Sequence, residues 1–250
     1  MLKFDCHHMD FHVTSRCNLS CLRCNRLTHL PQEQYPFERL VEDAGIMARY
    51  MQVGRLLVLG GEPLVYPRLG DLLDALRFVG LAKELVVVSN GVLSGSMPDS
   101  LLRKMDTYHI SRYPKVLHQG AVDAVKARCA SLGVRFEEHP VHTFFVTHSA
   151  EPTDPVATYG VCQMWHCREY REGYLTRCGT AVGINRVHGD QWRDSLRVDR
   201  SPEFADQVQR FFETKEPLAA CGNCYGSARP EAWREERDPA KFKALNELPP

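Results

Sequence analysis

Residues 55–63 read Arg55-Leu56-Leu57-Val58-Leu59-Gly60-Gly61-Glu62-Pro63, an apolar run that ends in two glycines, an acid and a proline. A short apolar run closed by turn residues predicts a buried strand of a parallel sheet. Glycines at a strand end leave the backbone uncovered, so that a ligand can approach closely, and a carboxylate there can meet a cationic group. We therefore expect a binding site at residues 60–63.

Apolar strands and amphipathic helices alternate on both sides of this stretch. The pattern predicts strands at 55–59, 84–88, 107–111 and 134–137, and helices near 36–51, 68–79, 99–105 and 118–131. Such alternation indicates βαβ units with right-handed crossovers and a parallel sheet. With about five units before residue 150, the fold class is α/β with fewer units than the eight of a closed barrel.

Polar residues follow two further predicted strands. Ser89, Asn90 and Gly91 come after strand 84–88, and Ser111 ends the next strand. Because active sites in such sheets lie at the carboxyl ends of the strands, we expect these residues to share one edge with residues 60–63.

Three cysteines lie upstream, in the run Cys17-Asn18-Leu19-Ser20-Cys21-Leu22-Arg23-Cys24. The C-x3-C-x2-C spacing lets a short loop direct three thiolates at one centre. Iron–sulfur clusters usually have four protein ligands, so three close cysteines suggest a cluster with one iron open to a substrate or cofactor. A zinc site with His29 as a further ligand is the alternative.

Together, the two motifs resemble the radical S-adenosylmethionine (SAM) superfamily, and the resemblance implies a partial (β/α)6 barrel. It implies a 4Fe–4S cluster on Cys17, Cys21 and Cys24, and a 5′-deoxyadenosyl radical, formed from SAM, that abstracts hydrogen from the substrate. An electron donor such as flavodoxin or ferredoxin would supply the electron. Arg23 stands where most members have an aromatic residue near the adenine. The residues implied to contact SAM are Gly60, Gly61, Glu62, Pro63, Ser89, Asn90 and Ser111.

A linker is predicted at residues 149–155, where prolines and small polar residues show no period. Beyond it lie a hairpin around Gly173 and the C-x2-C pair Cys221 and Cys224. This pattern is similar to the SPASM or twitch extension of radical SAM enzymes, in which four cysteines hold an auxiliary 4Fe–4S cluster. The resemblance implies Cys162, Cys178, Cys221 and Cys224 as the ligands, and a zinc site is the alternative.

Cys167 is a fifth cysteine in this region. It could replace Cys162 as a ligand, donate a hydrogen atom to a substrate radical, or be a buried structural thiol. The expected domains are the partial barrel at 1–150, a small cysteine-rich α+β extension at 151–228, and a charged tail at 229–250.

Charge and hydropathy limit the classes of partner and the cellular location that we expect for this chain. Lys plus Arg and Asp plus Glu each number 31 among 250 residues, which argues against nucleic acid or an anionic membrane as the main partner. No apolar run approaches the ~20 residues of a membrane span. The first residues lack the apolar stretch of a signal peptide, so we expect a cytoplasmic protein. Ten cysteines in such a chain favour metal ligands over disulfides.

These features predict an enzyme that acts on a small molecule, such as a sugar, an aminocyclitol or a nucleoside, by dehydrogenation or epimerisation. A peptide-modifying maturase of the same superfamily is the first alternative. A non-catalytic iron–sulfur or zinc protein is the second, although residues 60–63 argue against it, because an electron carrier needs no SAM site.

Overall fold

The computed structural model describes residues 3–26, 34–164 and 167–246. The chain divides into two compact units, of which the first comprises Met1–Asn18 and Glu33–His142 and the second Leu19–Gln32 and Thr143–Pro250. His29, the proposed additional zinc ligand, lies outside the described residues.

Five parallel strands form the sheet of the first unit, in the spatial order β5-β4-β3-β2-β1. The α/β class is confirmed, but this sheet is open, so a barrel is not established. The strands are β1 (Phe4–His12), β2 (Met51–Leu59), β3 (Ala82–Ser89), β4 (Thr107–Arg112) and β5 (Arg135–Pro140).

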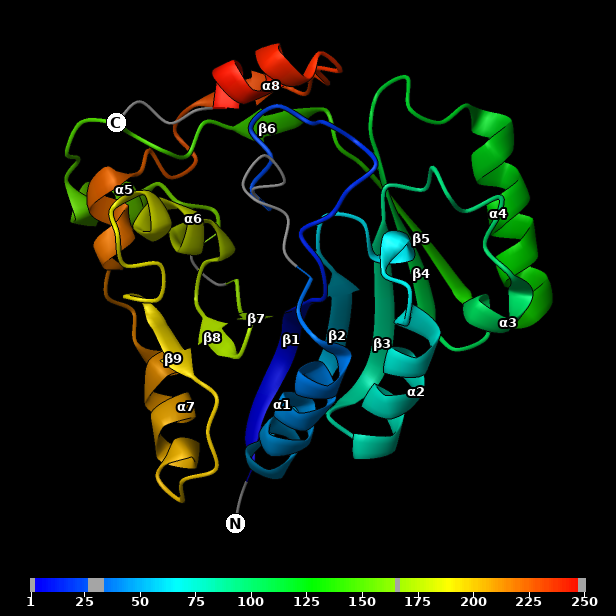
Figure 1. The fold of residues 1–250 in the computed structure, drawn as a ribbon, viewed down its shortest axis with the longest axis horizontal. Coiled ribbons are helices and arrows are strands. Elements are labelled where there is room, and N and C mark those ends of the chain that lie inside the picture. The colour runs from blue at the N-terminus through cyan, green and yellow to red at the C-terminus, as the bar shows by residue number, and fades with distance from the viewer. Residues whose placement is uncertain (1–2, 27–33, 165–166, 247–250) are drawn as a thin grey trace. The chain divides into compact units, whose positions relative to one another are not determined.

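Helices connect the consecutive strands, close to where the apolar periodicity predicts them. α1 and α2 lie together in front of β1–β3 (Figure 1). α2 and α4 each end at a glycine in the left-handed conformation, Gly80 and Gly133, which is the usual way to stop a helix before a strand. The helices are α1 (Phe37–Tyr50), α2 (Leu69–Val79), α3 (Asp99–Leu102) and α4 (Gln119–Leu132), and the 3-10 turn η1 (Pro63–Val65) follows β2.

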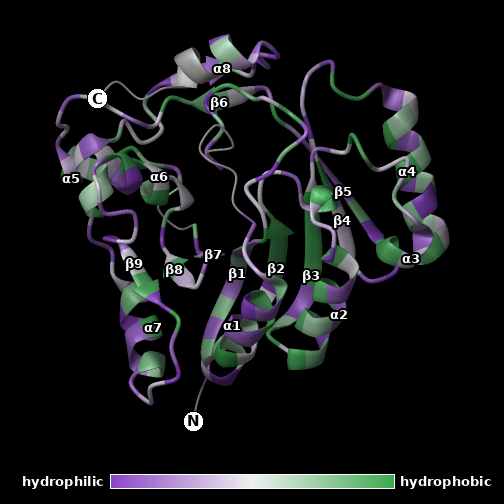
Figure 2. Cartoon of the chain, in the orientation of Figure 1, coloured by the Kyte–Doolittle hydropathy of each residue, from purple (hydrophilic) through white to green (hydrophobic). Residues whose placement is uncertain are grey.

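One face of the sheet forms the hydrophobic core of this unit. The register aligns Phe11 with Val58, Val58 with Val87, and Val87 with Tyr108, and all four side chains are fully buried. β2 and β3 are coloured hydrophobic along most of their length, whereas β1 carries hydrophilic positions (Figure 2). Most apolar side chains of α1 and α2, including Leu40 and Leu73, are buried as well, whereas Phe78 is exposed.

The second unit is built from short elements. The hairpin predicted around Gly173 is confirmed: β7 (Glu169–Arg171) pairs antiparallel with β8 (Tyr174–Thr176), and β9 (Ser195–Arg197) pairs with β8. Glu172 and Gly173 both have positive φ, as a tight two-residue hairpin turn requires. The helical elements are α5 (Pro155–Gly160), α6 (Gly179–Val187), α7 (Phe204–Glu213), η2 (Ala219–Asn223) and α8 (Pro239–Asn246).

The segment expected to be a charged tail takes part in backbone pairing at its start. β10 (Pro230–Ala232) pairs antiparallel with β6 (Thr143–Phe145), and residues 234–236 bond to residues 20–22. Backbone groups supply these contacts, so the charged composition of the segment did not reveal them. The two units divide between His142 and Thr143, whereas the sequence predicts a boundary near residue 150; the domain limits stay a prediction.

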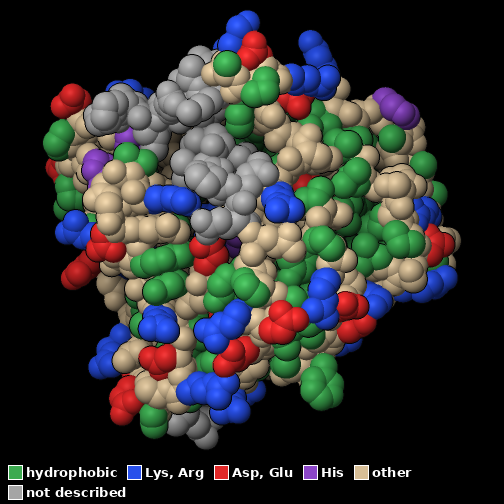
Figure 3. All heavy atoms as spheres, viewed as in Figure 1, with side chains coloured by type: hydrophobic (Ala, Val, Ile, Leu, Met, Phe, Trp, Pro, Cys, Tyr) green, Lys and Arg blue, Asp and Glu red, His purple; other side chains and the backbone are tan. Residues whose placement is uncertain are grey.

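The surface carries charges of both signs, interspersed on the face that Figure 3 displays, in line with the balanced composition. Within the described part of the chain, no helix combines the length and the hydropathy that crossing a membrane requires.

Candidate functional site

The glycine pair at the end of β2 lies against the chain's own backbone. Gly61 N–H donates to Thr14 O at 2.7 Å, and Glu62 N–H donates to Arg16 O at 2.8 Å. A Cβ added at Gly60 would lie 2.2 Å from Thr14 O, and one at Gly61 would lie 2.3 Å from Arg16 O. The backbone of residues 14–16 therefore packs directly against the two glycines, on the side where a side chain would lie. This packing positions the residue that follows, Cys17.

Glu62 is fully buried, and its carboxylate accepts hydrogen bonds from three donors. One carboxylate oxygen, Oε1, accepts from Leu64 N–H at 3.0 Å and from the Ser89 hydroxyl at 2.9 Å; Oε2 accepts from Asn90 N–H at 2.8 Å. Burial raises the pKa of Glu62, and these three hydrogen bonds act in the opposite direction. The side chain thus joins the ends of β2 and β3.

Asn90 extends this hydrogen-bonded group to the first cysteine. Its Nδ2 donates to Asn18 Oδ1 at 2.7 Å and lies 3.8 Å from Cys17 Sγ, while its Oδ1 accepts from Val92 N–H at 3.0 Å. Glu62, Ser89, Asn90 and Cys17 therefore form one site in the first unit, as the position of the strand ends predicts.

The remaining predicted SAM contacts lie near these strand ends. Pro63 is buried and begins η1, and Gly91 has a φ of 80°, a conformation that favours glycine. Ser111 is partly buried on β4, opposite His139 of β5. Contact of any of these residues with SAM stays a prediction.

The sheet face opposite the core carries a polar network that the sequence analysis missed. Arg55 Nη2 donates to both carboxylate oxygens of Glu137 at 2.7 and 2.9 Å, and its Nε lies 3.0 Å from Glu84. His109 Nδ1 lies 3.3 Å from Glu137, and burial lowers the pKa of His109. These residues come from four strands and meet only through the parallel register. A polar face suits a polar ligand, because parallel sheets are usually apolar on both faces.

Cys21 and Cys24 belong to the second unit. Cys21 is buried, and its backbone forms an isolated antiparallel β-bridge with that of Glu235. The N–H of the neighbouring Leu22 donates to Arg234 O at 2.9 Å. Arg23 turns the loop with a φ of 61°, rare for a residue with a side chain, and its Nε lies 3.6 Å from Glu231. Arg23, which stands where an aromatic residue is expected, therefore turns the loop between the two predicted ligands Cys21 and Cys24.

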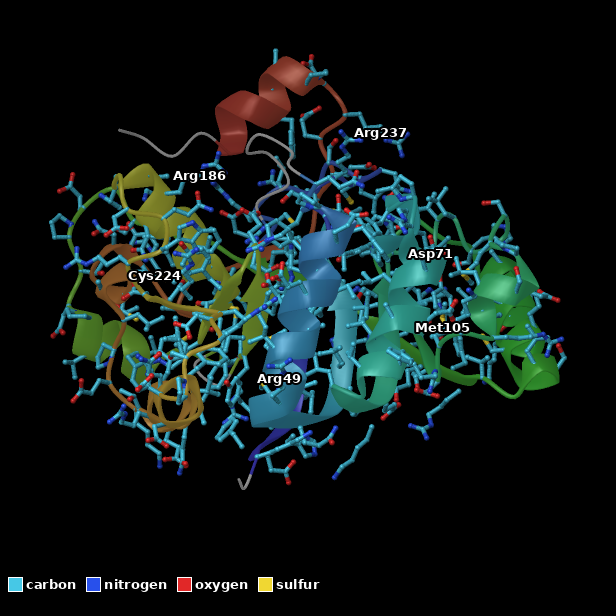
Figure 4. The ribbon with its side chains drawn as sticks, turned by 60° about the horizontal axis from the view of Figure 1, so that its bottom comes forward. Arg49, Asp71, Met105, Arg186, Cys224 and Arg237 are labelled. Carbon is cyan, nitrogen blue, oxygen red and sulfur yellow. The ribbon has the colours of Figure 1, made fainter. Side chains whose placement is uncertain are left out.

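The second unit brings four of the predicted cysteines together. Cys162, Cys178 and Cys221 all interact electrostatically with Cys224, and Cys162 also interacts with Cys178 and Cys221. Burial raises the pKa of Cys178 to about 11 and of Cys224 to about 12, and the neighbouring thiols add to both shifts. Figure 4 marks Cys224 in this region.

Local backbone contacts hold the C-x2-C turn and its sulfurs. Gly226 N–H donates to Cys224 Sγ at 3.2 Å, and Met164 N–H donates to Cys162 Sγ at 3.3 Å. Thr153, from the stretch predicted as a linker, donates from its hydroxyl to Cys221 O at 2.8 Å. Hydrogen bonds from N–H groups to cysteine sulfurs are typical of iron–sulfur sites, and they stabilise thiolates.

Cys167 is the fifth cysteine in the part of the chain beyond residue 150. It lines a pocket of about 370 Å³ together with Arg168, Arg177, Phe212, Glu213, Thr214 and Lys215. The thiol of Cys162 lies close enough to Cys178, Cys221 and Cys224 to raise the pKa of each. Of the two alternatives for the fourth ligand, this arrangement favours Cys162.

Among residues 3–26, 34–164 and 167–246, no group of three or more His, Cys, Asp or Glu side chains is arranged to hold a metal ion. Both ligand sets therefore stay predictions. The donor chemistry nevertheless fits a cluster: the second unit has four neighbouring cysteines, two of whose sulfurs accept a backbone N–H, and the first has an amide N–H directed at Cys17.

Comparison with known proteins finds a family model, two relatives and one solved structure. Residues 11–116 match the family model of the radical SAM superfamily. The GTP 3′,8-cyclase of Moorella thermoacetica is 25% identical over 130 residues, which are 48% of this chain and 40% of that protein. The GTP 3′,8-cyclase of Heliobacterium modesticaldum is 25% identical over 170 residues, which are 62% of this chain and 50% of that protein.

The crystal structure of BtrN in complex with AdoMet and 2-DOIA aligns with 89% of this chain and 94% of that one, at 14% identity and a TM-score of 0.49. The matched part of this chain spans half or less of the length of the two cyclases.

Proposed function

We propose that this chain, whose residues 11–116 match the family model of the radical SAM superfamily, uses a SAM-derived radical to abstract hydrogen from a small-molecule substrate. Cys17, Cys21 and Cys24 would hold the 4Fe–4S cluster. When bound, the cluster and SAM would supply one-electron cleavage of SAM to a 5′-deoxyadenosyl radical.

The observation that carries the proposal is the set of hydrogen bonds from Glu62 through Asn90 to Asn18 and Cys17. It joins the two predicted motifs in one site, although about forty residues separate them in the sequence. Glu62 fixes the end of β3, and Asn90 in turn fixes the start of the cysteine loop. These residues would position the loop and exclude water behind it, because Glu62 and Ser89 are buried.

The second cysteine set supports an auxiliary 4Fe–4S cluster on Cys162, Cys178, Cys221 and Cys224. A second cluster on these cysteines would favour a redox outcome, since it can accept an electron from the substrate radical or return one to it. We propose that the reaction is a dehydrogenation or an epimerisation and that a protein such as flavodoxin or ferredoxin donates the electron. We propose neither nucleic acid nor a membrane as a partner. Cys167, which lines the pocket with Arg168 and Phe212, is proposed as a hydrogen-atom donor to the substrate radical.

Within the small-molecule class, a nucleoside or nucleotide is the first candidate, because the curated relatives are named GTP 3′,8-cyclase. Sugars and aminocyclitols follow. The polar face around Arg55, His109 and Glu137 suits hydroxyl and amino groups, which hydrogen-bond to charged side chains.

A substrate panel tests the proposal. Anaerobically reconstituted protein with SAM and dithionite is incubated with GTP, other nucleosides, aminocyclitols, sugars or unstructured peptides, and 5′-deoxyadenosine is quantified. We expect at least one small molecule to raise its formation about tenfold above the substrate-free rate, by positioning a carbon for reaction. A protein without reductant serves as the control. Stimulation by peptides alone would reject the small-molecule proposal in favour of a maturase.

A further inference from the structure

We propose that the Asn90 carboxamide donates a hydrogen bond to the Cys17 sulfur and thereby raises the reduction potential of the cluster bound at Cys17. The inference rests on the proposed function, because it concerns the cluster that the Cys17 loop would hold. It gives Asn90 a role directed at the cluster, in addition to any contact with SAM.

The orientation of the Asn90 amide is fixed by its surroundings. Val92 N–H donates to Asn90 Oδ1 at 3.0 Å, so this atom must be the carbonyl oxygen. The amide nitrogen therefore lies on the other side, where Asn18 Oδ1 accepts from it at 2.7 Å. Cys17 Sγ lies 3.8 Å from the same nitrogen. An amide nitrogen carries two N–H groups, so it can serve both acceptors.

The backbone of Asn90 is held as firmly as its side chain. Its N–H donates to Glu62 Oε2 at 2.8 Å, and Asn90 is itself buried. Glu62 also binds the hydroxyl of Ser89, the preceding residue. Asn90 thus has little freedom to move away from Cys17 in response to a change in the loop, which makes Glu62 a positioning residue for this donor.

The electrostatic consequence has a definite sign. Reduction adds negative charge to a cluster and its thiolates, and an N–H group that donates to a thiolate sulfur stabilises the more negative state. Hydrogen bonds to the sulfurs and burial are among the properties that set cluster potentials. Removing the donor should therefore make the potential more negative, and a carboxylate in its place should do so more strongly.

The experiment is an EPR-monitored redox titration of anaerobically reconstituted protein. Asn90→Asp keeps the size of the side chain and an acceptor for Val92 N–H, but replaces the donor with an anionic oxygen. Asn90→Leu removes the donor without adding charge. Ser96→Ala is the matched control, because Ser96 is exposed on the same loop and its hydroxyl donates to Leu93 O. The relevant signal is the one that changes when SAM is added.

For Asn90→Asp we expect the ratio of reduced to oxidised cluster at a fixed potential to fall about tenfold, which is about 59 mV for one electron. Asn90→Leu should show a smaller change of the same sign, and Ser96→Ala none. A role limited to holding the loop would lower cluster occupancy and leave the potential of the loaded molecules unchanged.

An unchanged potential in both Asn90 variants overturns the inference, whatever their occupancy. Loss of the cluster in both would assign Asn90 to loop assembly and overturn it too. A parent protein whose signal does not respond to SAM would instead reject the proposed function. The two failures are therefore distinguishable.

Discussion

A Glu62→Ala variant is expected to lose about 3 kcal/mol of its free energy of unfolding. The substitution leaves three donors without their acceptor, of which those of Ser89 and Asn90 are buried and that of Leu64 is partly buried, and each unsatisfied buried donor costs about 1–3 kcal/mol. Relief of the buried charge offsets part of this cost, since burial raises the pKa of Glu62. Urea denaturation followed by circular dichroism measures the change.

Two further variants separate structure from SAM binding. Asp123→Ala, at an exposed helix position, is the control and should change stability by less than about 0.5 kcal/mol. Glu62→Gln keeps one acceptor oxygen and the size of the side chain. If the charge of Glu62 also binds the amino group of SAM, Glu62→Gln should weaken SAM affinity about tenfold with a stability loss near 1 kcal/mol. A Glu62→Ala stability equal to that of Asp123→Ala would show that the buried carboxylate does not join the strand ends.

Replacing Cys178 or Cys224 with serine is expected to remove about half of the iron, roughly four of about eight atoms per chain, because the single auxiliary cluster would need all four of its cysteine ligands. Cys162→Ser should do the same, since Cys162 interacts with the other three thiols. Iron and acid-labile sulfide are measured after anaerobic reconstitution, together with zinc.

Cys167→Ser is the matched comparison and should keep its full iron content, because the ligand set proposed above uses Cys162 and not Cys167. Cys129→Ser, buried in α4, tests for general damage to folding. Iron loss in Cys167→Ser with retention in Cys162→Ser would reverse the ligand assignment. Stoichiometric zinc in the parent, with no iron beyond one cluster, would establish the zinc alternative for the second unit.

The sequence predicted the regular part of the first unit well. Strands β2–β5 and helices α1–α4 follow from apolar periodicity, which reflects burial on one face or both. β1 was missed, because Phe4–His12 mixes histidine and aspartate with apolar residues and becomes a strand only by pairing with β2. Its neighbour in the sheet lies about forty residues away in the sequence, beyond any local pattern.

The candidate residues were also found, but their partners were not. The glycines of residues 60–61 were expected to let a ligand approach; Thr14 and Arg16 fill the side on which a side chain would lie, and contact with SAM stays a prediction. The carboxylate of Glu62 reaches Ser89 and Asn90, a contact that no spacing rule encodes. The Arg55–Glu137 pair likewise depends on strand register, so an arginine at the start of an apolar run carried no signal by itself.

The central claim is that Cys17, Cys21 and Cys24 hold a cluster that cleaves SAM. The most direct measurement compares the parent with a Cys17/Cys21/Cys24→Ala triple variant, both reconstituted anaerobically, for iron content and for 5′-deoxyadenosine formed with SAM and dithionite. The account predicts that the triple variant keeps about half of the iron, from the second cysteine set, and forms no 5′-deoxyadenosine. Undiminished 5′-deoxyadenosine formation by the triple variant would contradict it.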